Sequence, residues 1–178
     1  SSLFTIARRR ILWLLILVLA NGLTTKVIAM NDQILKEIVL LAAFIPLLIG
    51  TGGNVGAQSS TVVIRGLSTQ KLKSLGAIKA VVKEAITGAL LGIFMMLVVF
   101  PFAWWQGEGP LIASAVGISL ISITTLAATT GAILPLLFDK MKLDPALMSS
   151  PFITTVTDIA GVFIYLSTAK WLLNSSLT

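Results

Sequence analysis

The chain has 178 residues, of which 56% are hydrophobic and 11% are charged, and thirteen Lys and Arg against seven Asp and Glu give it a net charge of +6. A soluble domain with so few polar residues would lack the surface to cover itself, so the composition predicts an all-α polytopic membrane protein. The sequence contains no cysteine and no histidine, which excludes disulfides, thiolate and imidazole metal sites, and hydrolases with a histidine base.

Five long stretches with little or no charge can each hold a membrane-spanning helix. We predict one transmembrane domain over 1–178, with spans at 11–28, 38–64, 85–105, 110–138 and 151–171. The first stretch is short, and Lys26 has to snorkel for the helix to reach the ~20 residues that ~30 Å of hydrocarbon requires. The second has 27 uncharged residues, too many for a straight, untilted span. Because Pro46 also removes a helix hydrogen bond, we expect a break or bend there.

Proline residues mark the ends of the later spans. Pro101 and the Trp104–Trp105 pair are expected to close the third helix, and Pro110 suits the first turn of the fourth, which predicts a tight hairpin between them. The pairs Asp-Pro at 144–145 and Ser-Pro at 150–151 each resemble an N-cap followed by a first-turn proline. A short helix or a kink is therefore expected before the fifth span.

Basic residues are unevenly shared between the two sides of this topology. If the chain starts inside, ten fall in internal segments: Arg8, Arg9, Arg10, Arg65, Lys71, Lys73, Lys79, Lys83, Lys140 and Lys142. The other side has Lys26, Lys36 and Lys170. This asymmetry predicts a cytoplasmic N-terminus and an outside C-terminus, so the positive charge reflects topology and no nucleic-acid partner is expected.

Asp158 is the acidic residue that lies deep within a predicted span. Twelve residues precede it from Ala146 and eleven follow it to Ala169, which places it near the bilayer midplane. An ionised group there costs ~2.5–3.5 kcal/mol on insertion scales, so it has to face water, a cation or a partner. The structural alternative is a pair with a snorkelling Lys or Arg, or a protonated carboxyl bonded to a Thr. Because no basic residue lies at a matching depth in any span, we predict that Asp158 is functional.

Two sets of small and polar residues accompany this carboxylate. On a helix, Asp158 shares one face with Thr154, Gly161 and Tyr165, and Gly161 would allow another backbone to come close. In the second span a polar stripe is predicted from Thr51, Asn54, Gln58, Thr61 and Arg65. Gly52 and Gly56 have the spacing of close helix contacts. In the structural alternative, the glycines only allow close helix packing and the amides only link helices. We favour a water-lined cavity, because unwound or strained backbone at membrane depth is stable only where protein or water satisfies its polar groups.

Other polar and aromatic residues have structural explanations. Ser122, Thr125 and Thr129 align on the fourth span and are expected to bond back to carbonyls of their own helix. The tryptophans are expected to be interfacial anchors, and the methionines to face lipid or fill the core. We assign none of them a ligand role.

The ligands along this path are carboxylate, amide and hydroxyl oxygens and backbone carbonyls, the set that suits Mg²⁺, Ca²⁺, Mn²⁺ or Na⁺. One carboxylate does not neutralise a divalent ion, whereas a two-fold axis near Asp158 would bring a second carboxylate from an identical protomer. We therefore predict a homodimer. Since Mg²⁺ sheds water reluctantly, sparse ligands around a roomy site favour an ion bound through its water shell.

Four segments resemble a known family. They are PLLIGTGGNVGAQ at 46–58, IRG at 64–66, DPA at 144–146 and PFITTVTD at 151–158. In this order and in a five-span setting they are similar to the transmembrane domain of the MgtE magnesium channels, and the resemblance covers nearly the whole chain.

The resemblance implies a homodimeric, non-enzymatic magnesium channel of the inner cell membrane, with its pore lined by the second and fifth helices of both subunits. It implies that Asp158 is the selectivity aspartate holding hydrated Mg²⁺, with the carbonyl of Thr154 as a further contact and Asn54 nearby. Alanine is common at the position of Thr154 in the family, but the carbonyl survives that change. The remaining lining residues would be Gly53, Gln58, Thr51, Gly161 and Thr157. Mn²⁺ and Co²⁺ are further candidate ions, and lipid is the surrounding partner.

Family members also carry a cytosolic magnesium-sensing region and a connecting helix before the first span. Because this sequence begins two residues before Leu3, we expect that region to be absent and magnesium-dependent closure to be lost or altered.

Three other functions fit parts of the pattern. A coupled exchanger would alternate Mg²⁺ with Na⁺ or H⁺ at Asp158 and would stop without a gradient of the coupling ion. An intramembrane aspartyl protease needs two catalytic aspartates and would require a dimer dyad. A structural assembly subunit would show no ion dependence.

Overall fold

A computed structural model describes residues 3–37, 39–69 and 76–176. Ile38, Lys71 and Lys73 lie outside the described residues, as do the side chains of Arg9, Arg10 and Trp13. Every regular element in the described part is helical: α1 (Leu3–Ala29), α2 (Asp32–Glu37), α3 (Val39–Ser68), α5 (Ala77–Ala103), the π-helical turn η1 (Trp104–Glu108), α6 (Gly109–Lys140) and α7 (Pro145–Ser176). The all-α prediction is confirmed, whereas α2 was not predicted.

Four of the helices are long and apolar enough to cross a membrane. They cover Val39–Ser68, Ala77–Gln106, Gly109–Lys140 and Pro151–Asn174, which confirms the second to fifth predicted spans by length and composition. In α1 the apolar stretch that the described side chains establish covers Leu14–Ala29. A membrane crossing by α1 therefore stays a prediction.

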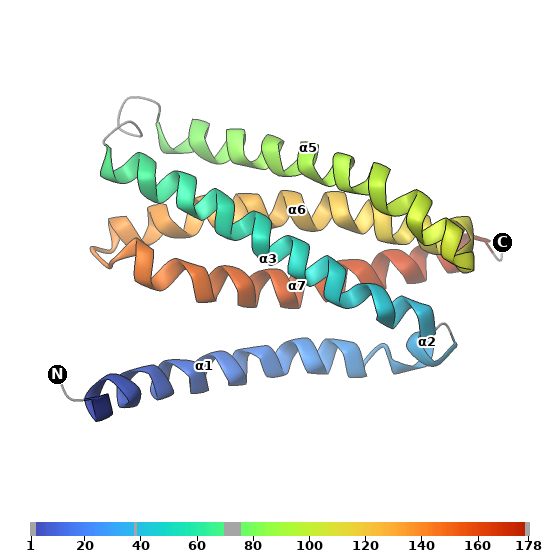
Figure 1. The fold of residues 1–178 in the computed structure, drawn as a ribbon, viewed down its shortest axis with the longest axis horizontal. Coiled ribbons are helices and arrows are strands. Elements are labelled where there is room, and N and C mark those ends of the chain that lie inside the picture. Colours follow the sequence, from blue (N-terminus) through green and yellow to red (C-terminus); the bar gives the residue numbers. More distant parts are fainter. Residues whose placement is uncertain (1–2, 38, 70–75, 177–178) are drawn as a thin grey trace.

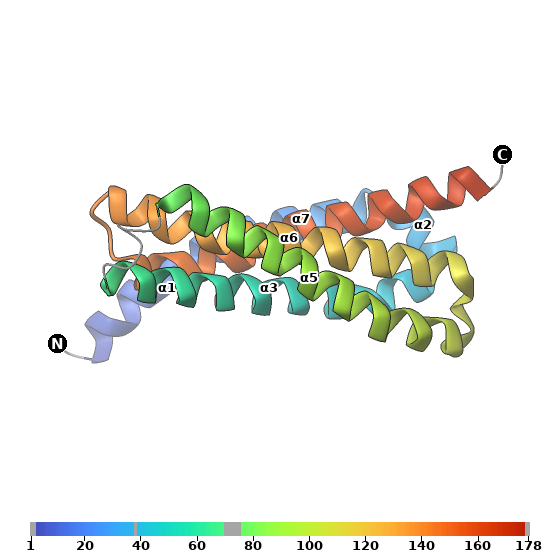
Figure 2. The same cartoon turned by 90° about the horizontal axis from the view of Figure 1, so that it is seen from above.

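The four long helices form a bundle around α6 (Figures 1 and 2). In this bundle α6 packs against α3, α5 and α7, and it is the most buried of the four spans. Outside it, α1 packs mainly against α7. In Figure 1, α3 runs diagonally across α6 and α7. Its 30 residues make a helix about 45 Å long, and the oblique course fits that length within a bilayer.

The proline residues interrupt the helices less than the sequence indicates. Of the break or bend expected in α3, the break is wrong, because Pro46 lies inside one continuous helix; a bend at Pro46 stays a prediction. The short helix or kink expected before the fifth span is also not a separate element, since α7 begins at Pro145 and includes Pro151. A proline in a transmembrane helix is tolerated because neighbouring groups satisfy the freed carbonyl.

The predicted hairpin between the third and fourth spans is confirmed, but it forms through an unexpected element. Pro101 lies within α5, and the chain then continues as the π-helical turn η1. Gly109, with φ of 74°, reverses the direction. This backbone conformation costs a glycine little, and Pro110 lies in the first turn of α6.

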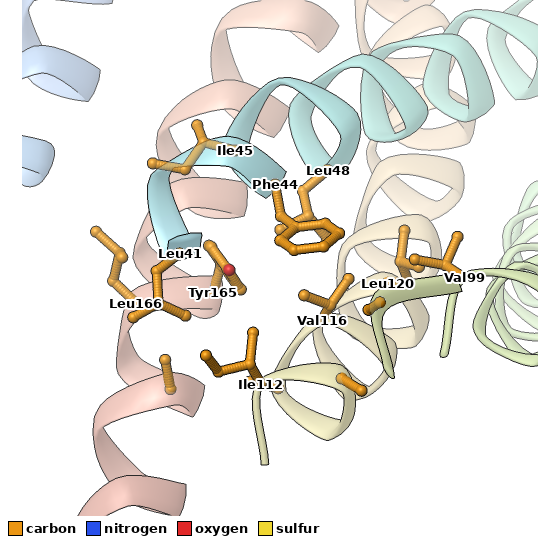
Figure 3. Packing of buried hydrophobic residues seen from close by; sticks show 14 of the residues in the cluster. Leu41, Phe44, Ile45, Leu48, Val99, Ile112, Val116, Leu120, Tyr165 and Leu166 are labelled. Carbon is orange, nitrogen blue, oxygen red and sulfur yellow. The ribbon is translucent and has the colours of Figure 1, made fainter. Parts of the chain in front are cut away.

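The two halves of the bundle are packed differently. Large side chains fill the half near α2 and the end of α7, where α3, α6, α7 and α5 contribute Leu41, Phe44, Leu48, Val116, Leu120, Tyr165, Leu166 and Val99 among others (Figure 3). In the other half the buried cluster contains only Val55, Ala127 and Ala128. Small residues there let the helices approach closely.

Candidate functional site

The carboxylate singled out in the sequence lies well inside α7. Asp158 comes thirteen residues after the start of this helix and eighteen before its end, about 20 Å and 27 Å along the axis. The residue is half-buried. Its position therefore combines membrane depth with access to the surface of the single chain.

Within the described part of the chain, no counter-charge meets this carboxylate. The side chain of Asp158 forms no ion pair and no hydrogen bond there, and the ion pair found joins Lys36 to Asp32, one turn apart on the exposed α2. The structural alternative of a pairing Lys, Arg or Thr is thus not seen in this part of the chain. Burying an ionised carboxylate without a partner is costly, so the group requires water, a cation or another subunit.

The glycine-rich segment forms the crossing of α3 with α7. A Cβ atom placed on Gly53 would lie 3.8 Å from Cγ2 of Thr154, and one on Gly52 would lie 3.7 Å from Cβ of Thr157. The same position on Gly52 would be 2.7 Å from a methyl group of Ile123 in α6. The close approach predicted for the glycine pair is confirmed. Since Asn54 follows Gly53 and Asp158 follows Thr157, both polar groups lie within one residue of the crossing.

The predicted polar stripe of α3 is also confirmed. The segment is helical throughout, and Asn54, Gln58, Thr61 and Arg65 are all exposed, while Thr51 is half-buried. The hydroxyl of Thr61 donates to the carbonyl of Ala57 at 2.9 Å. The amides of Asn54 and Gln58 have no such internal bond among the described residues. Primary amides facing hydrocarbon would lose their hydrogen bonds, so this surface requires a polar covering.

Threonine hydroxyls fix the backbone just before Asp158. The hydroxyl of Thr157 donates to the carbonyls of Ile153, at 2.8 Å, and Thr154, at 2.9 Å. The carbonyl of Thr154 also accepts the helical N–H of Asp158. With two donors already engaged, this carbonyl suits contact with an ion through the ion's water shell better than direct coordination.

Two of the predicted lining residues are interior. Thr157 is 1% exposed and faces α3 at Gly52. Gly161 is buried against the side chain of Ile123, where an added Cβ would make ordinary contacts of 3.7–3.8 Å. The expectation that Gly161 admits another backbone is therefore wrong within this chain. The face of α7 that is exposed at Thr154 is buried at Gly161, because α3 and α6 pack against α7.

Sequence reasoning missed the residue that joins the three helices here. Ile123 is 1% exposed and packs beside both Gly52 and Gly161. It therefore ties α6 to α3 and α7 at the level of the crossing. An isoleucine within an apolar span carries no signal that would distinguish it.

The hydroxyl groups aligned on α6 have the structural role that the sequence predicted. Ser122 donates to the carbonyl of Ile118, Thr125 to that of Ile121 and Thr129 to that of Thr125, at 3.1, 2.7 and 2.7 Å. Among the described residues there is also no group of three or more acidic side chains that could hold a metal ion. Asp158 is therefore not part of a cluster of that size within the described part of one chain.

Comparison with known proteins decides the family. Residues 45–168, which include α5 and α6 together with every site residue on α3 and α7, match the model of the MgtE family, described as a divalent cation transporter. This chain belongs to the MgtE family. The chain is similar to the magnesium transporter MgtE of Thermus thermophilus, with 38% identity over 93% of this chain and 37% of that protein. It is 33% identical to the magnesium transporter MgtE of Bacillus subtilis over 98% of this chain and 39% of that protein.

A third MgtE transporter, from Enterococcus faecalis, is 34% identical over 92% of this chain and 36% of its own length. The chain thus spans little more than a third of the curated relatives that it matches. The MgtE match confirms the resemblance carried by the glycine–asparagine segment and the fifth-span aspartate. It identifies a multi-pass membrane protein of a divalent cation transporter family.

Proposed function

We propose that two copies of this chain form a channel that conducts hydrated Mg²⁺, with the Asp158 side chains of both subunits at its narrowest polar site. The observation that carries this proposal is the half-buried carboxylate deep in α7 that has no partner among the described residues. The names of the relatives, all magnesium transporters, support the choice of ion.

A two-fold axis near Asp158 would give two negative charges to one divalent ion, which solves the charge problem that one chain leaves open. Without a cation, two adjacent carboxylates would repel each other and one would hold a proton. The transported ion is thus also what would make this arrangement stable. Asp158 would hold the ion electrostatically through its water shell, as the reluctance of Mg²⁺ to lose water favours.

The rest of the pore would come from the surface where α3 crosses α7. The exposed amides of Asn54 and Gln58, with Thr51 and Gly53 beside them, would bind water in the passage. The carbonyl of Thr154 would accept from water one turn before the carboxylate. Thr157 and Gly161, which are buried, would hold α7 in position instead of lining the path.

In the proposed membrane arrangement α1 crosses as the first of five spans, with the N-terminus in the cytoplasm. Arg65, Lys79, Lys83, Lys140 and Lys142 lie at one end of the bundle, where α3 and α6 end and α5 begins (Figure 1). An excess of basic residues in short loops favours the cytoplasmic side. The potential across the membrane would then drive the cation inward past Asp158.

The test compares two substitutions that each remove one acidic charge. Asp158→Asn is the test variant, and Asp139→Asn, at the exposed end of α6, is the matched control. Both are reconstituted into liposomes containing a magnesium-sensitive dye, with the voltage set by a potassium gradient and valinomycin. Asp158→Asn should reduce Mg²⁺ influx by at least about two orders of magnitude, since two charge-assisted contacts per dimer are lost, and Asp139→Asn should conduct normally.

Normal conduction by a correctly folded Asp158→Asn dimer would refute the site. Size-exclusion chromatography and thermal unfolding without Mg²⁺ establish that folding. Influx that required a Na⁺ or proton gradient at fixed voltage would replace the channel with a coupled exchanger. Transport by a monomer would refute the shared site on the dyad.

A further inference from the structure

The outer face of α5 is exposed and carries two adjacent rows of side chains. Ile78, Val82 and Ile86, at intervals of four residues, form an apolar row with exposed fractions of 81%, 51% and 57%. Beside it, Lys79 and Lys83 form a row of two exposed ammonium groups. Residues four apart on a helix are neighbours on one face, so an apolar surface and two positive charges lie side by side.

These residues surround a shallow hollow of about 360 Å³. It is lined by Ile78, Lys79, Val82, Lys83, Ile86 and Thr87. No helix of the described chain covers this face, because α5 packs against α6 on its other side. There Gly88 approaches the backbone of Thr124, and Glu84, the nearest acidic residue along the helix, is buried.

The hollow lies at the depth where a bilayer changes from hydrocarbon to headgroups. Trp104 and Trp105 at the far end of α5 are exposed, as interfacial aromatic residues are. Lys83 precedes Trp105 by 22 residues, or about 33 Å of helix, which corresponds to the ~30 Å hydrocarbon thickness. Lys83 and Lys79 therefore reach the phosphate level, while Ile86 and Leu90 lie at the level of acyl chains.

The two lysines lack a counter-charge on this face. Within the part of the chain that the structure describes, neither forms an ion pair. An anionic headgroup would satisfy both ammonium groups, and the acyl chain of the same lipid would cover the apolar surface beyond them, at Ile86 and Leu90. A zwitterionic headgroup offers no net charge to the same pair.

We propose that the hollow on α5 binds an anionic phospholipid, with the phosphate group between Lys79 and Lys83 and one acyl chain along Ile86 and Leu90. The placement of this lipid in the cytosolic leaflet rests on the orientation proposed above. Lipid binding itself does not depend on transport, so its test is separate from that of the channel.

The test uses a single label, which is possible because the sequence has no cysteine. Leu90→Cys, one turn beyond Ile86 on the exposed row, carries a bimane fluorophore in the reconstituted protein. Quenching is measured with brominated phosphatidylglycerol and with brominated phosphatidylcholine. Half-maximal quenching by brominated phosphatidylglycerol should occur at a mole fraction about thirtyfold lower than for brominated phosphatidylcholine. This ratio corresponds to about 1 kcal/mol for each of the two lysines at an anionic lipid surface. Lys79→Gln with Lys83→Gln should remove that preference.

Two controls keep the result specific. The same label at Ile133→Cys on α6, seven residues inside Lys140 as Leu90 is seven inside Lys83, should show no such preference. Lys26→Gln with Lys170→Gln removes two charges at the opposite end and should leave quenching at Leu90→Cys unchanged. Equal quenching by the two lipids in the parent protein would overturn the proposal. Loss of the dimer in the Lys79 and Lys83 variant would also overturn it and assign this face to a second copy.

Discussion

The contact between α3 and α6 gives a prediction that depends on backbone geometry. A Cβ atom added at Gly131 would lie 3.0 Å from the carbonyl carbon and 3.1 Å from the Cα of Gly56, and its overlap with the carbonyl oxygen is still closer. All three atoms belong to the backbone of α3, which has no rotamer to change. Gly131→Ala can therefore be accommodated only if the two helices separate.

The magnitude follows from two opposing terms. Overpacking a close contact costs about 1–3 kcal/mol when backbone has to shift, while alanine gains ~1 kcal/mol over glycine within a helix. Gly131→Ala should therefore lower the free energy of unfolding by up to about 2 kcal/mol. At Gly50, on α3, no atom lies within 4 Å of an added Cβ, so Gly50→Ala should be neutral or raise that free energy by up to ~1 kcal/mol.

The assay is reversible unfolding of the purified protein in mixed micelles, followed by tryptophan fluorescence as the fraction of denaturing detergent rises. The two glycine-to-alanine variants match in chemistry and differ in their surroundings. If Gly131→Ala proved as stable as Gly50→Ala, the close backbone contact would be wrong, and with it the reason that this half of the bundle can use such small side chains.

Two further predictions concern the site and the topology. Thr157→Val keeps the buried volume and removes the hydroxyl, which donates to two carbonyls that retain their helical N–H partners. The free energy of unfolding should therefore change by less than ~1 kcal/mol. A decrease of more than ~2 kcal/mol in the same assay would show that this hydroxyl stabilises more than its own helix. Single cysteines at the exposed positions Ala7, Gln106 and Met141 test the spans with an impermeant maleimide on oriented vesicles. Ala7→Cys and Met141→Cys should react from the cytosolic side and Gln106→Cys from outside, whereas labelling of Ala7→Cys from outside would contradict a crossing by α1.

Much of the fold follows from charge spacing and helical periodicity. The second to fifth spans, the hairpin before Pro110 and the stripe through Asn54 and Gln58 could be predicted because each depends on residues close in sequence. The continuity of α3 through Pro46 could not. Whether a proline breaks a membrane helix depends on which neighbouring groups satisfy the freed carbonyl, and those come from distant parts of the chain.

The same division applies to the site. Asp158 stands out in the sequence because a charge within a span is expensive, and the structure places it beside the glycine crossing. Helical spacing correctly aligned Thr154 with Gly161, but it could not show where α3 and α6 cover that face. Ile123 could not be found, since its importance comes from the two glycines that it touches.

The unequal lengths of the helices have a consequence for the surrounding lipid. The apolar stretch of α1 that the described side chains establish covers Leu14–Ala29, about 24 Å of helix, and the other candidate spans are helices of 24 to 32 residues. A hydrophobic segment shorter than the bilayer is accommodated by local thinning of the bilayer or by snorkelling of flanking side chains, at a cost of fractions of a kcal/mol per ångström. Because α1 packs on α7, the helix that carries Asp158, a host membrane with longer acyl chains would have to thin beside this pair of helices if α1 crosses as proposed above, so the length of the lipid would act on the helix that bears the carboxylate.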